Sequence, residues 1–333
     1  MMPVPAKTEL QALMFGNRLT KRLKHLNKWA RRVGVEAFRL YDRDIPEIPL
    51  VLDYYGSAVS GSLYKRPYQV EDEEERVWLS AMSQTITDVL TIPPERVFLK
   101  MRERQRGKAQ YGKLAGQRVT LDTREGGLVF RVNLSNYLDT GLFLDARKAR
   151  AFVKAESAGK RVLNLFCYTG AFSVYAASGG ACAVDSVDLS KTYLDWAMLN
   201  FSLNGFEAPD LTSCHAMDVG CFLEESRRRR LVWDFIVLDP PSFSNSKKTR
   251  GTFDIRRDHR ALIHQCLGLL APGGSLFFSA NARGFRLKPA EFHGLSIQDI
   301  SDILVDEDFQ GKKTPSRYLV KPQHSGKDIL DRS

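Results

Sequence analysis

The sequence predicts an α/β protein: a parallel sheet with helices on both faces in the second half, preceded by a smaller basic α+β domain. Three observations carry this prediction. An apolar strand, a tight turn and a helix of small apolar residues follow one another over 161–180. Short apolar runs of strand length then alternate with helical stretches, which is typical of βαβ units. The basic excess lies in the first part of the chain, since 1–150 carry most of the net charge.

The composition indicates a globular protein with room for two domains. Of the 333 residues, 43% are apolar and 26% are charged. The net charge of +10 and the isoelectric point near 9.3 favour a polyanionic partner, nucleic acid first. Neither a bilayer-spanning apolar run nor a hydrophobic signal core is present in the sequence, so we expect a cytoplasmic protein that does not use a membrane.

Metal and disulfide chemistry are not expected. The cysteines form no C-x-x-C pair and are scattered along the second half. Such a set is typical of reduced, partly buried thiols and not of a zinc site or a disulfide framework. The sequence gives no sign of its oligomeric state.

The N-terminal part predicts a helix, a small sheet and a second helix. Hydrophobic spacing and turn residues place the helices at 14–34 and 72–89, and the strands at 37–40, 50–55, 58–63, 97–100, 119–121 and 128–134. The domain boundary is expected between 135 and 150. We therefore expect a basic RNA-binding α+β domain over 1–140, a catalytic domain over 141–322, and a tail over 323–333.

Two groups of basic residues in this part are candidates for RNA contact. The polar face of the first helix and the loop after 97–100 carry Arg18, Lys21, Arg22, Lys24, Lys28, Arg31 and Arg32, and Arg102, Arg104, Arg106 and Lys108. Glycines and Tyr111 in that loop suit phosphate contacts and base stacking. A solvated basic face and an exposed hairpin tip fit the same patterns.

The second half predicts the parallel sheet. Its strands are expected over 162–166, 184–188, 212–217, 233–238 and 275–280, and its helices over 171–178, 193–204, 224–230 and 257–270. Ser190 is expected to cap the second of these helices, and a further helix starts near Asp145. A closing hairpin is expected from 303–309 and 317–320.

The turn after the first of these strands suggests a cofactor. Residues 164–170 contain a single glycine, and the dinucleotide fingerprint G-x-G-x-x-G is absent. A pyrophosphate therefore has no close backbone approach, whereas S-adenosylmethionine, which has no phosphate, fits a looser turn. Taken alone, the segment also fits a βα turn without a ligand.

Three acids follow successive predicted strands. Asp188, Asp218 and Asp239 stand at carboxyl ends, where ligands of open α/β sheets bind. Asp188 suits ribose hydroxyls, and Asp218 suits the exocyclic amine of an adenine. Asp239 begins a rigid D-P-P turn, in which two prolines remove two N–H donors. Each feature alone is weak, but their order and spacing together indicate an S-adenosylmethionine site.

Several segments resemble a known family. NLFCYTGAFSVYAA, VDLSKTYLDWAMLNFSLNG, FIVLDPPSFSNSK, FDIRRDH and FSANARGFR are similar to Rossmann-like class I methyltransferases of large-subunit rRNA, nearest the RlmK type that methylates guanine N7 of 23S rRNA. In many bacteria this unit is half of a fused RlmKL protein. The other half, a guanine-N2 methyltransferase, is missing here, so we expect a free-standing enzyme.

The resemblance implies site residues. The cofactor would contact Phe143, Asp145, Arg147, Phe166, Tyr168, Thr169, Gly170, Asp188, Leu189, Ser190, Asp218 and Val219, and the methyl group and target base would face Asp239, Pro240, Pro241 and Ser242. Guanine N7 has a lone pair and no proton, so it would attack the methyl group directly, without a general base. Asp239 would then orient the base or the methionine amine.

Alternative functions remain open at this point. Cytosine-C5 transfer needs a cysteine nucleophile, which neither 239–246 nor 279–283 contains. Guanine-N2 transfer is the nearest alternative, since amine methyltransferases often carry N/D-P-P-Y/F. A non-catalytic RNA-binding assembly factor and a small-molecule methyltransferase are also compatible with the fold.

Overall fold

A computed structural model describes residues 5–64, 71–102, 119–245 and 252–323. The chain divides into two compact units. Unit 1 comprises 1–144 together with 307–312, and unit 2 comprises 145–306 together with 313–333. The sequence analysis placed 307–312 with the second domain, and nothing in the residue pattern pointed to their membership of unit 1.

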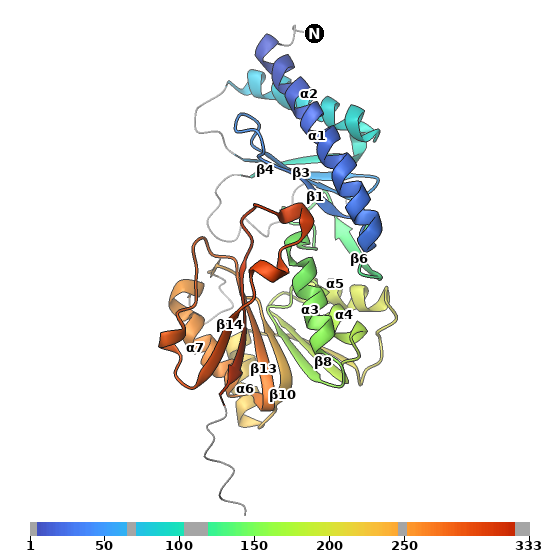
Figure 1. The fold of residues 1–333 in the computed structure, drawn as a ribbon. Helices are drawn as coiled ribbons and strands as arrows, with labels where there is room; N and C mark the ends of the chain where they lie inside the picture. Colours follow the sequence, from blue (N-terminus) through green and yellow to red (C-terminus); the bar gives the residue numbers. More distant parts are fainter. Residues whose placement is uncertain (1–4, 65–70, 103–118, 246–251, 324–333) are drawn as a thin grey trace, which may run out of the picture. The chain divides into compact units, whose positions relative to one another are not determined.

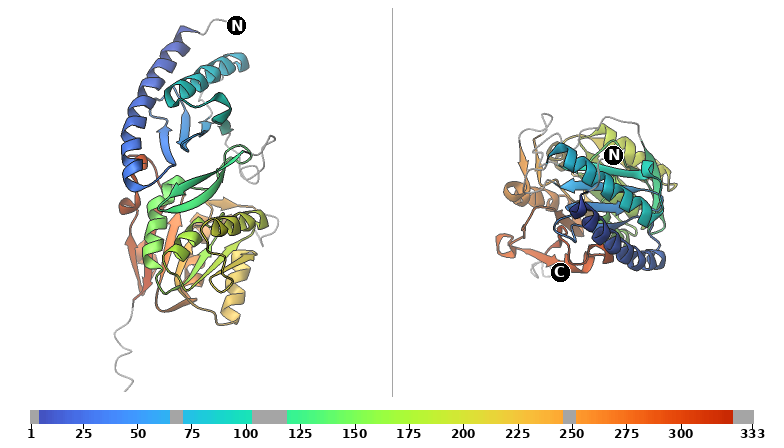
Figure 2. Two further views of the ribbon diagram at one scale, coloured as in Figure 1. Left: turned by 90° about the vertical axis from the view of Figure 1, so that its right-hand side faces the viewer. Right: turned by 90° about the horizontal axis from the view of Figure 1, so that it is seen from above.

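Unit 1 combines two helices with a small sheet. Its elements are α1 (Ala6–Val33), β1 (Phe38–Asp42), β2 (Leu50–Tyr54), β3 (Val59–Tyr64), α2 (Asp72–Leu90), the 3₁₀ turn η1 (Pro94–Arg96), β4 (Val97–Arg102), and the hairpin β5 (Thr120–Glu125) and β6 (Leu128–Asn133). The sheet order is β1-β2-β3-β4, with β1 to β3 antiparallel and β4 parallel to β3. Helices α1 and α2 lie side by side (Figure 2) and enclose one apolar core with the sheet.

Helix α1 starts eight residues earlier than the sequence predicts, at Ala6 instead of residue 14. Its first turns bury Thr8 and Gln11, and Gln11 accepts a hydrogen bond of 2.6 Å from the Trp78 indole of α2. Polar residues on the buried face interrupt the apolar period, and this is why the pattern begins too late.

The expected hairpin of 303–309 with 317–320 is wrong. Residues 302–304 and 307–309 form the 3₁₀ turns η5 (Asp302–Leu304) and η6 (Glu307–Phe309). The second turn joins unit 1, where the Asp308 carboxylate accepts from the Arg39 amide at 2.9 Å and the Arg39 guanidinium lies over the Phe309 ring. These contacts with a distant strand, and not a local strand pairing, determine the path of 307–312.

Unit 2 is built on a predominantly parallel sheet. Its elements are η3 (Leu144–Ala146, whose first residue still belongs to unit 1), α3 (Arg147–Glu156), β7 (Arg161–Leu165), α4 (Ala171–Ser178), β8 (Ala183–Asp188), α5 (Lys191–Ser202), β9 (Thr212–Ala216), α6 (Val219–Arg228), β10 (Trp233–Leu238), β11 (Phe243–Ser244), β12 (Phe253–Asp254), α7 (Ile255–Leu267), β13 (Leu270–Ala280), η4 (Pro289–Glu291), β14 (Leu295–Asp299) and β15 (Ser316–Pro322). The strand order is β14-β15-β13-β10-β7-β8-β9 (Figure 1), with β15 antiparallel to both of its neighbours.

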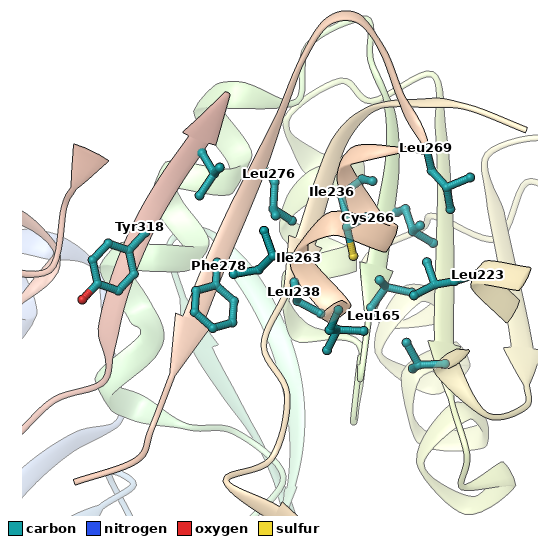
Figure 3. Close-up of a cluster of buried hydrophobic side chains, with 14 of the residues drawn as sticks. Leu165, Leu223, Ile236, Leu238, Ile263, Cys266, Leu269, Leu276, Phe278 and Tyr318 are labelled. Carbon is teal, nitrogen blue, oxygen red and sulfur yellow. The ribbon is translucent and has the colours of Figure 1, made fainter. Parts of the chain in front are cut away.

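The predicted α/β class is confirmed. Strands β9, β8, β7, β10 and β13 are parallel and occupy the predicted segments. Phe277 of β13 packs against Phe152 of α3 and Phe172 of α4 on one face. Its neighbour Phe278 joins the core with Leu223 of α6 and Ile263 of α7 on the other face (Figure 3). Helices therefore cover both faces of the sheet.

The strand order reverses between β7 and β10. Strands β8 and β9 follow β7 on one side, and β13 follows β10 on the other. The loops that leave β7 and β10 consequently diverge at this point. Ligands of open α/β sheets bind in the crevice outside such a switch point.

Candidate active site

The carboxyl edge of unit 2, defined here as 166–170, 188–190 and 239–242, brings most of the predicted site residues together. It follows the neighbouring strands β7, β8 and β10. Phe166 and Tyr168 have φ of 57° and 52°, and Gly170 has φ of 72°. A left-handed conformation at a non-glycine residue costs about 1–3 kcal/mol and tends to occur at functional sites. The turn after β7 is therefore strained in a way that a purely connecting loop does not need.

Glycine is required at the end of this turn for two reasons. Its φ is positive, and a Cβ on Gly170 would lie 2.7 Å from the Cβ of Ala197 in α5. Asn200 of the same helix donates to the Thr169 carbonyl at 2.9 Å. The Thr169 side chain is buried, so Thr169 lines the turn with its backbone and not with its side chain. Helix α5 thus holds the turn from behind.

A buried polar network supports the turn from below. Asn164 of β7 and Ser186 of β8 both donate to Ser173 of α4, each at 2.8 Å. All three side chains are buried and hydrogen-bonded. Sequence analysis missed this network, and its only signal is the presence of polar residues at core positions of otherwise apolar elements.

The Asp188 carboxylate is oriented entirely by backbone. It accepts from the amides of Tyr168 at 3.0 Å and Ser190 at 2.9 Å, and also from the amide of Leu189. Burial raises the pKa of Asp188, and these amide donors oppose that shift. A carboxylate offers about four acceptor positions, so the backbone leaves capacity for a ligand hydroxyl.

The residues after β8 and β9 also have structural tasks. Ser190 caps α5 by accepting from the Tyr193 amide, as predicted. Asp218 caps α6 by accepting from the Cys221 amide at 3.2 Å, while Val219 is buried in the core. The Met217 amide donates to the Asp188 carbonyl at 3.1 Å, which joins the two strand ends.

Asp239 stands among charged groups from other elements. Burial raises its pKa, while a hydrogen bond from Ser279 of β13 and the positive charges of Arg317 and Arg150 oppose this shift. The charge of Asp145 raises the pKa further. After the D-P-P turn, with Pro240 buried and Pro241 half-buried, the Ser242 hydroxyl donates to the Asn281 carbonyl at 2.8 Å. The turn is thereby tied to the end of β13.

The segment before α3 is held by buried arginines. Arg317 of β15 donates to the Asp145 carbonyl at 2.8 Å and to the Leu304 carbonyl at 3.2 Å. Arg147 is buried and pairs with Asp306 at 2.9 Å. Phe143 belongs to unit 1 and is 45% exposed. Sequence analysis missed Arg317, whose signal is a lone arginine inside an apolar strand.

The predicted RNA-contacting residues differ in availability. Arg18 pairs with Asp44 at 2.8 Å, and Arg22 is half-buried and donates to the Leu40 and Asp308 carbonyls. The exposed members of the α1 set are Lys21, Lys24, Lys28, Arg31 and Arg32. The Arg102 side chain, Arg104, Arg106, Lys108 and Tyr111 lie outside the described residues.

The described residues contain neither a metal-ligand cluster nor a membrane-spanning helix. Across 5–64, 71–102, 119–245 and 252–323, no three His, Cys, Asp or Glu side chains are grouped so that they could hold a metal ion. Over the same ranges, no helix has the length and apolarity needed to cross a membrane.

Comparison with known proteins adds three findings. A family of S-adenosylmethionine-dependent methyltransferases matches residues 41–288. "Ribosomal RNA large subunit methyltransferase K" of Neisseria meningitidis is 47% identical over 299 residues, which cover 90% of this chain and 84% of that protein. "Ribosomal RNA large subunit methyltransferase K/L" of Stutzerimonas stutzeri is 46% identical over 297 residues, which cover 89% of this chain and 40% of that protein. The chain therefore spans less than half the length of the K/L relative.

A solved structure shares the fold. It is described as a methyltransferase complexed with SAH, and its TM-score is 0.72 at 26% sequence identity. The match covers 93% of this chain and 81% of that chain. Both units are thus included in the similarity.

Proposed function

Because the chain belongs to the family of S-adenosylmethionine-dependent methyltransferases, we propose that it methylates a guanine of large-subunit (23S) rRNA at N7. The names of the K and K/L relatives support the substrate class. The observation that carries the proposal is the carboxyl edge, where a strained turn lies between Asp188 and the D-P-P turn at Asp239. Its place of action would be the cytoplasm.

The residues of this edge fit an S-adenosylmethionine molecule. Asp188, held by backbone amides, would accept from the ribose, and the half-buried rings of Phe166 and Tyr168 would border it. Asp218, with Leu189 and Val219, would lie along the adenine edge. When bound, the cofactor supplies a methyl group made electrophilic by the sulfonium. Gly170 and Thr169 would shape the turn instead of contacting the ligand through side chains.

Methyl transfer to N7 needs no general base in the protein. N7 attacks with a lone pair and loses no proton, so the site needs only to align the base, the methyl group and the sulfur. Asp239 would hold the methionine ammonium or the base through its negative charge. Burial strengthens such a contact because the local dielectric constant is low. Asp145 and Arg147, fixed by Arg317 and Asp306, would form one wall.

The state of the cysteines argues against cytosine-C5 chemistry. Cys266 lies on the buried face of α7, and burial raises its thiol pKa. Cys167, although it lies in the turn after β7, is also buried, and burial holds its thiol pKa well above the ordinary value. A nucleophilic cysteine requires an accessible thiolate. Direct attack by a purine nitrogen fits this site better.

Unit 1 would supply RNA affinity. The exposed basic face of α1, with Lys21, Lys24, Lys28, Arg31 and Arg32, suits a phosphate backbone. Arg18 and Arg22 would instead maintain the unit, because both are engaged with its own groups. Domain 1–140 as an RNA-binding domain is part of the same proposal.

A methyl-transfer assay tests the proposal. The protein is incubated with S-adenosylmethionine and unmodified 23S rRNA, and the digested nucleosides are identified by mass spectrometry. We expect 7-methylguanosine, which Asp239→Ala abolishes and the exposed control Asp195→Ala leaves unchanged. If N2-methylguanosine is found instead, the proposed reaction becomes methylation at guanine N2, and the proposed site residues are kept. Cofactor binding without any methylated nucleoside would contradict the substrate class.

A further inference from the structure

Two motifs of unit 2 have no task in the site described so far. FDIRRDH and FSANARGFR lie at the start of α7 and at the end of β13. The structure joins both to the D-P-P turn. Ser242 donates through its hydroxyl to the Asn281 carbonyl and accepts through its carbonyl from the Ile255 amide at 3.2 Å. Arg256 donates to the Arg283 carbonyl.

These contacts build one surface from three distant segments. It consists of Phe243, Arg256 and Arg283, which we call the basic rim. Phe243 follows the D-P-P turn directly and is 47% exposed, although it is a large aromatic residue. It lies in β11, which pairs with β12 just before α7. The ring therefore stands in solvent beside the carboxyl edge.

The positive charge of the rim is not neutralised by acids. Among the ion pairs of the described residues, neither Arg256 nor Arg283 has an acidic partner. The nearby acids are otherwise engaged: Asp254 caps α7 by accepting from the Arg256 amide, and Asp258 pairs with Arg257 at 2.7 Å. An exposed ring on the same surface as guanidinium groups without an acidic partner is a combination that binds single-stranded RNA, by base stacking and phosphate contacts.

We propose that the basic rim binds the RNA strand next to the target guanine, with a flanking base on Phe243 and phosphates on Arg256 and Arg283. This inference rests on the proposed function, since it assumes an RNA substrate. The flanking position follows from geometry. Phe243 is exposed beyond Ser242, whereas the target base must reach the half-buried Asp239. Unit 2 thus carries its own RNA contacts, separate from the basic helix α1.

Direct RNA binding tests the rim independently of catalysis. Filter binding of a labelled, unmodified 23S rRNA transcript is measured for Phe243→Ala and Arg283→Glu at several salt concentrations, with saturating SAH. Phe243→Ala should weaken binding about 5- to 150-fold without changing the salt dependence, because stacking contributes about 1–3 kcal/mol per base. Arg283→Glu should also reduce the slope of log Kd against log salt by about 0.7, the value of one phosphate contact.

Matched controls lie where β10 begins, at the opposite edge of the sheet. Arg228→Glu changes the charge on an exposed residue near the end of α6, and Val232→Ala truncates an apolar residue that is 39% exposed. Both should bind RNA like the unaltered protein. Phe243→Tyr should keep most of the affinity, because it retains the aromatic face, whereas Phe243→Leu should not. If Phe243 acts only through its bulk, the two variants should bind RNA equally well.

Kinetics then separate the possible failures. We expect the rim variants to raise KM for RNA, with kcat within twofold and SAH affinity unchanged. RNA binding equal to that of the controls would overturn the proposal, as would a loss confined to kcat, which would place the ring on the target base. An unaltered protein that binds RNA through the rim but methylates none would instead refute the proposed function.

Discussion

Two aspartates on β8, three residues apart, differ in their hydrogen-bond donors and in the direction of their pKa shifts. Asp185 accepts from His215 at 2.9 Å and from the Trp233 indole at 2.7 Å, and these side-chain donors lower its pKa despite partial burial. Among the described residues, the donors to Asp188 are backbone amides, and burial raises its pKa. The side-chain donors of the fold thus stabilise the charged form of Asp185. The backbone amides do not fully offset the cost of burying the charge of Asp188.

We infer that the difference separates a structural acid, Asp185, from the proposed ligand-binding acid, Asp188, on one strand. A buried charge with matched partners stabilises its surroundings, whereas a buried charge without a cation costs free energy until a ligand supplies donors. Asp239 resembles Asp188 in that burial raises its pKa, although the positive charges of Arg317 and Arg150 partly oppose that shift. We infer that the buried carboxylates of the carboxyl edge lower the stability of the fold and are kept because they bind the ligand. The following predictions test that contrast.

The largest effect is expected at Asp239. Asp239→Asn should lower kcat/KM at least about 100-fold, because the negative charge that would orient the ligands is lost. Because its pKa is raised, the folded state binds this proton more tightly than the unfolded state does. The resulting stabilisation is complete below the unfolded pKa and is lost as pH rises through the folded pKa. The neutral variant should therefore be as stable as the original at pH 7 or more stable, as thermal unfolding would reveal. A clear loss of stability would show that Asp239 is structural.

A stability loss without loss of site chemistry is expected at Asp185. Asp185→Ala leaves the Trp233 indole without its acceptor, which should cost about 2–3 kcal/mol in urea unfolding at pH 7. Its folded pKa is lowered, so its contribution is present above the unfolded pKa, near 4, and disappears as pH falls through the folded value. The difference from the original protein should shrink at pH 3. The exposed pair member Asp195 gives a control, whose Ala variant should change stability by less than about 0.5 kcal/mol.

A loss of stability no larger than that at Asp185 is expected from the glycine that ends the strained turn. Gly170→Ala should cost about 2–3 kcal/mol, from the left-handed backbone and from contact with Ala197. Gly205 has a φ of 73° with nothing within 4 Å of its Cβ position, so Gly205→Ala should cost only about 1 kcal/mol. Equal losses in the two variants would mean that the turn can move away from α5.

The same contrast explains what sequence reasoning could reach. The strands over 184–188 and 233–238 were predictable because each is a short segment of strand-forming residues that ends at or just before an acid, Asp188 or Asp239. Asp188 and Asp239 could be predicted as site residues because each follows or ends a strand that the sequence pattern predicts. Strand β14 was missed although Leu295 and Ile297 alternate with polar residues, because the alternation covers only five residues at the sheet edge.

The partners of the site acids were out of reach for a different reason. Arg317 and Ser279 meet Asp239 only after three strands have been placed side by side. Likewise, 307–312 join unit 1 through Asp308 and Lys312, whose partners lie more than 260 positions earlier. Such contacts leave no local periodicity. The His215 and Trp233 partners of Asp185 belong to the same class.

Calorimetric titration of S-adenosylmethionine into Asp188→Asn and Asp185→Asn tests the central contrast most directly. We expect Asp188→Asn to weaken binding at least about tenfold while its stability stays within about 1 kcal/mol of the original, because the neutral amide is cheaper to bury. Asp185→Asn should bind within twofold of the original protein and unfold at lower urea. Unchanged affinity in Asp188→Asn, or an equal loss of affinity in both variants, would contradict the assignment of the carboxyl edge as the cofactor site.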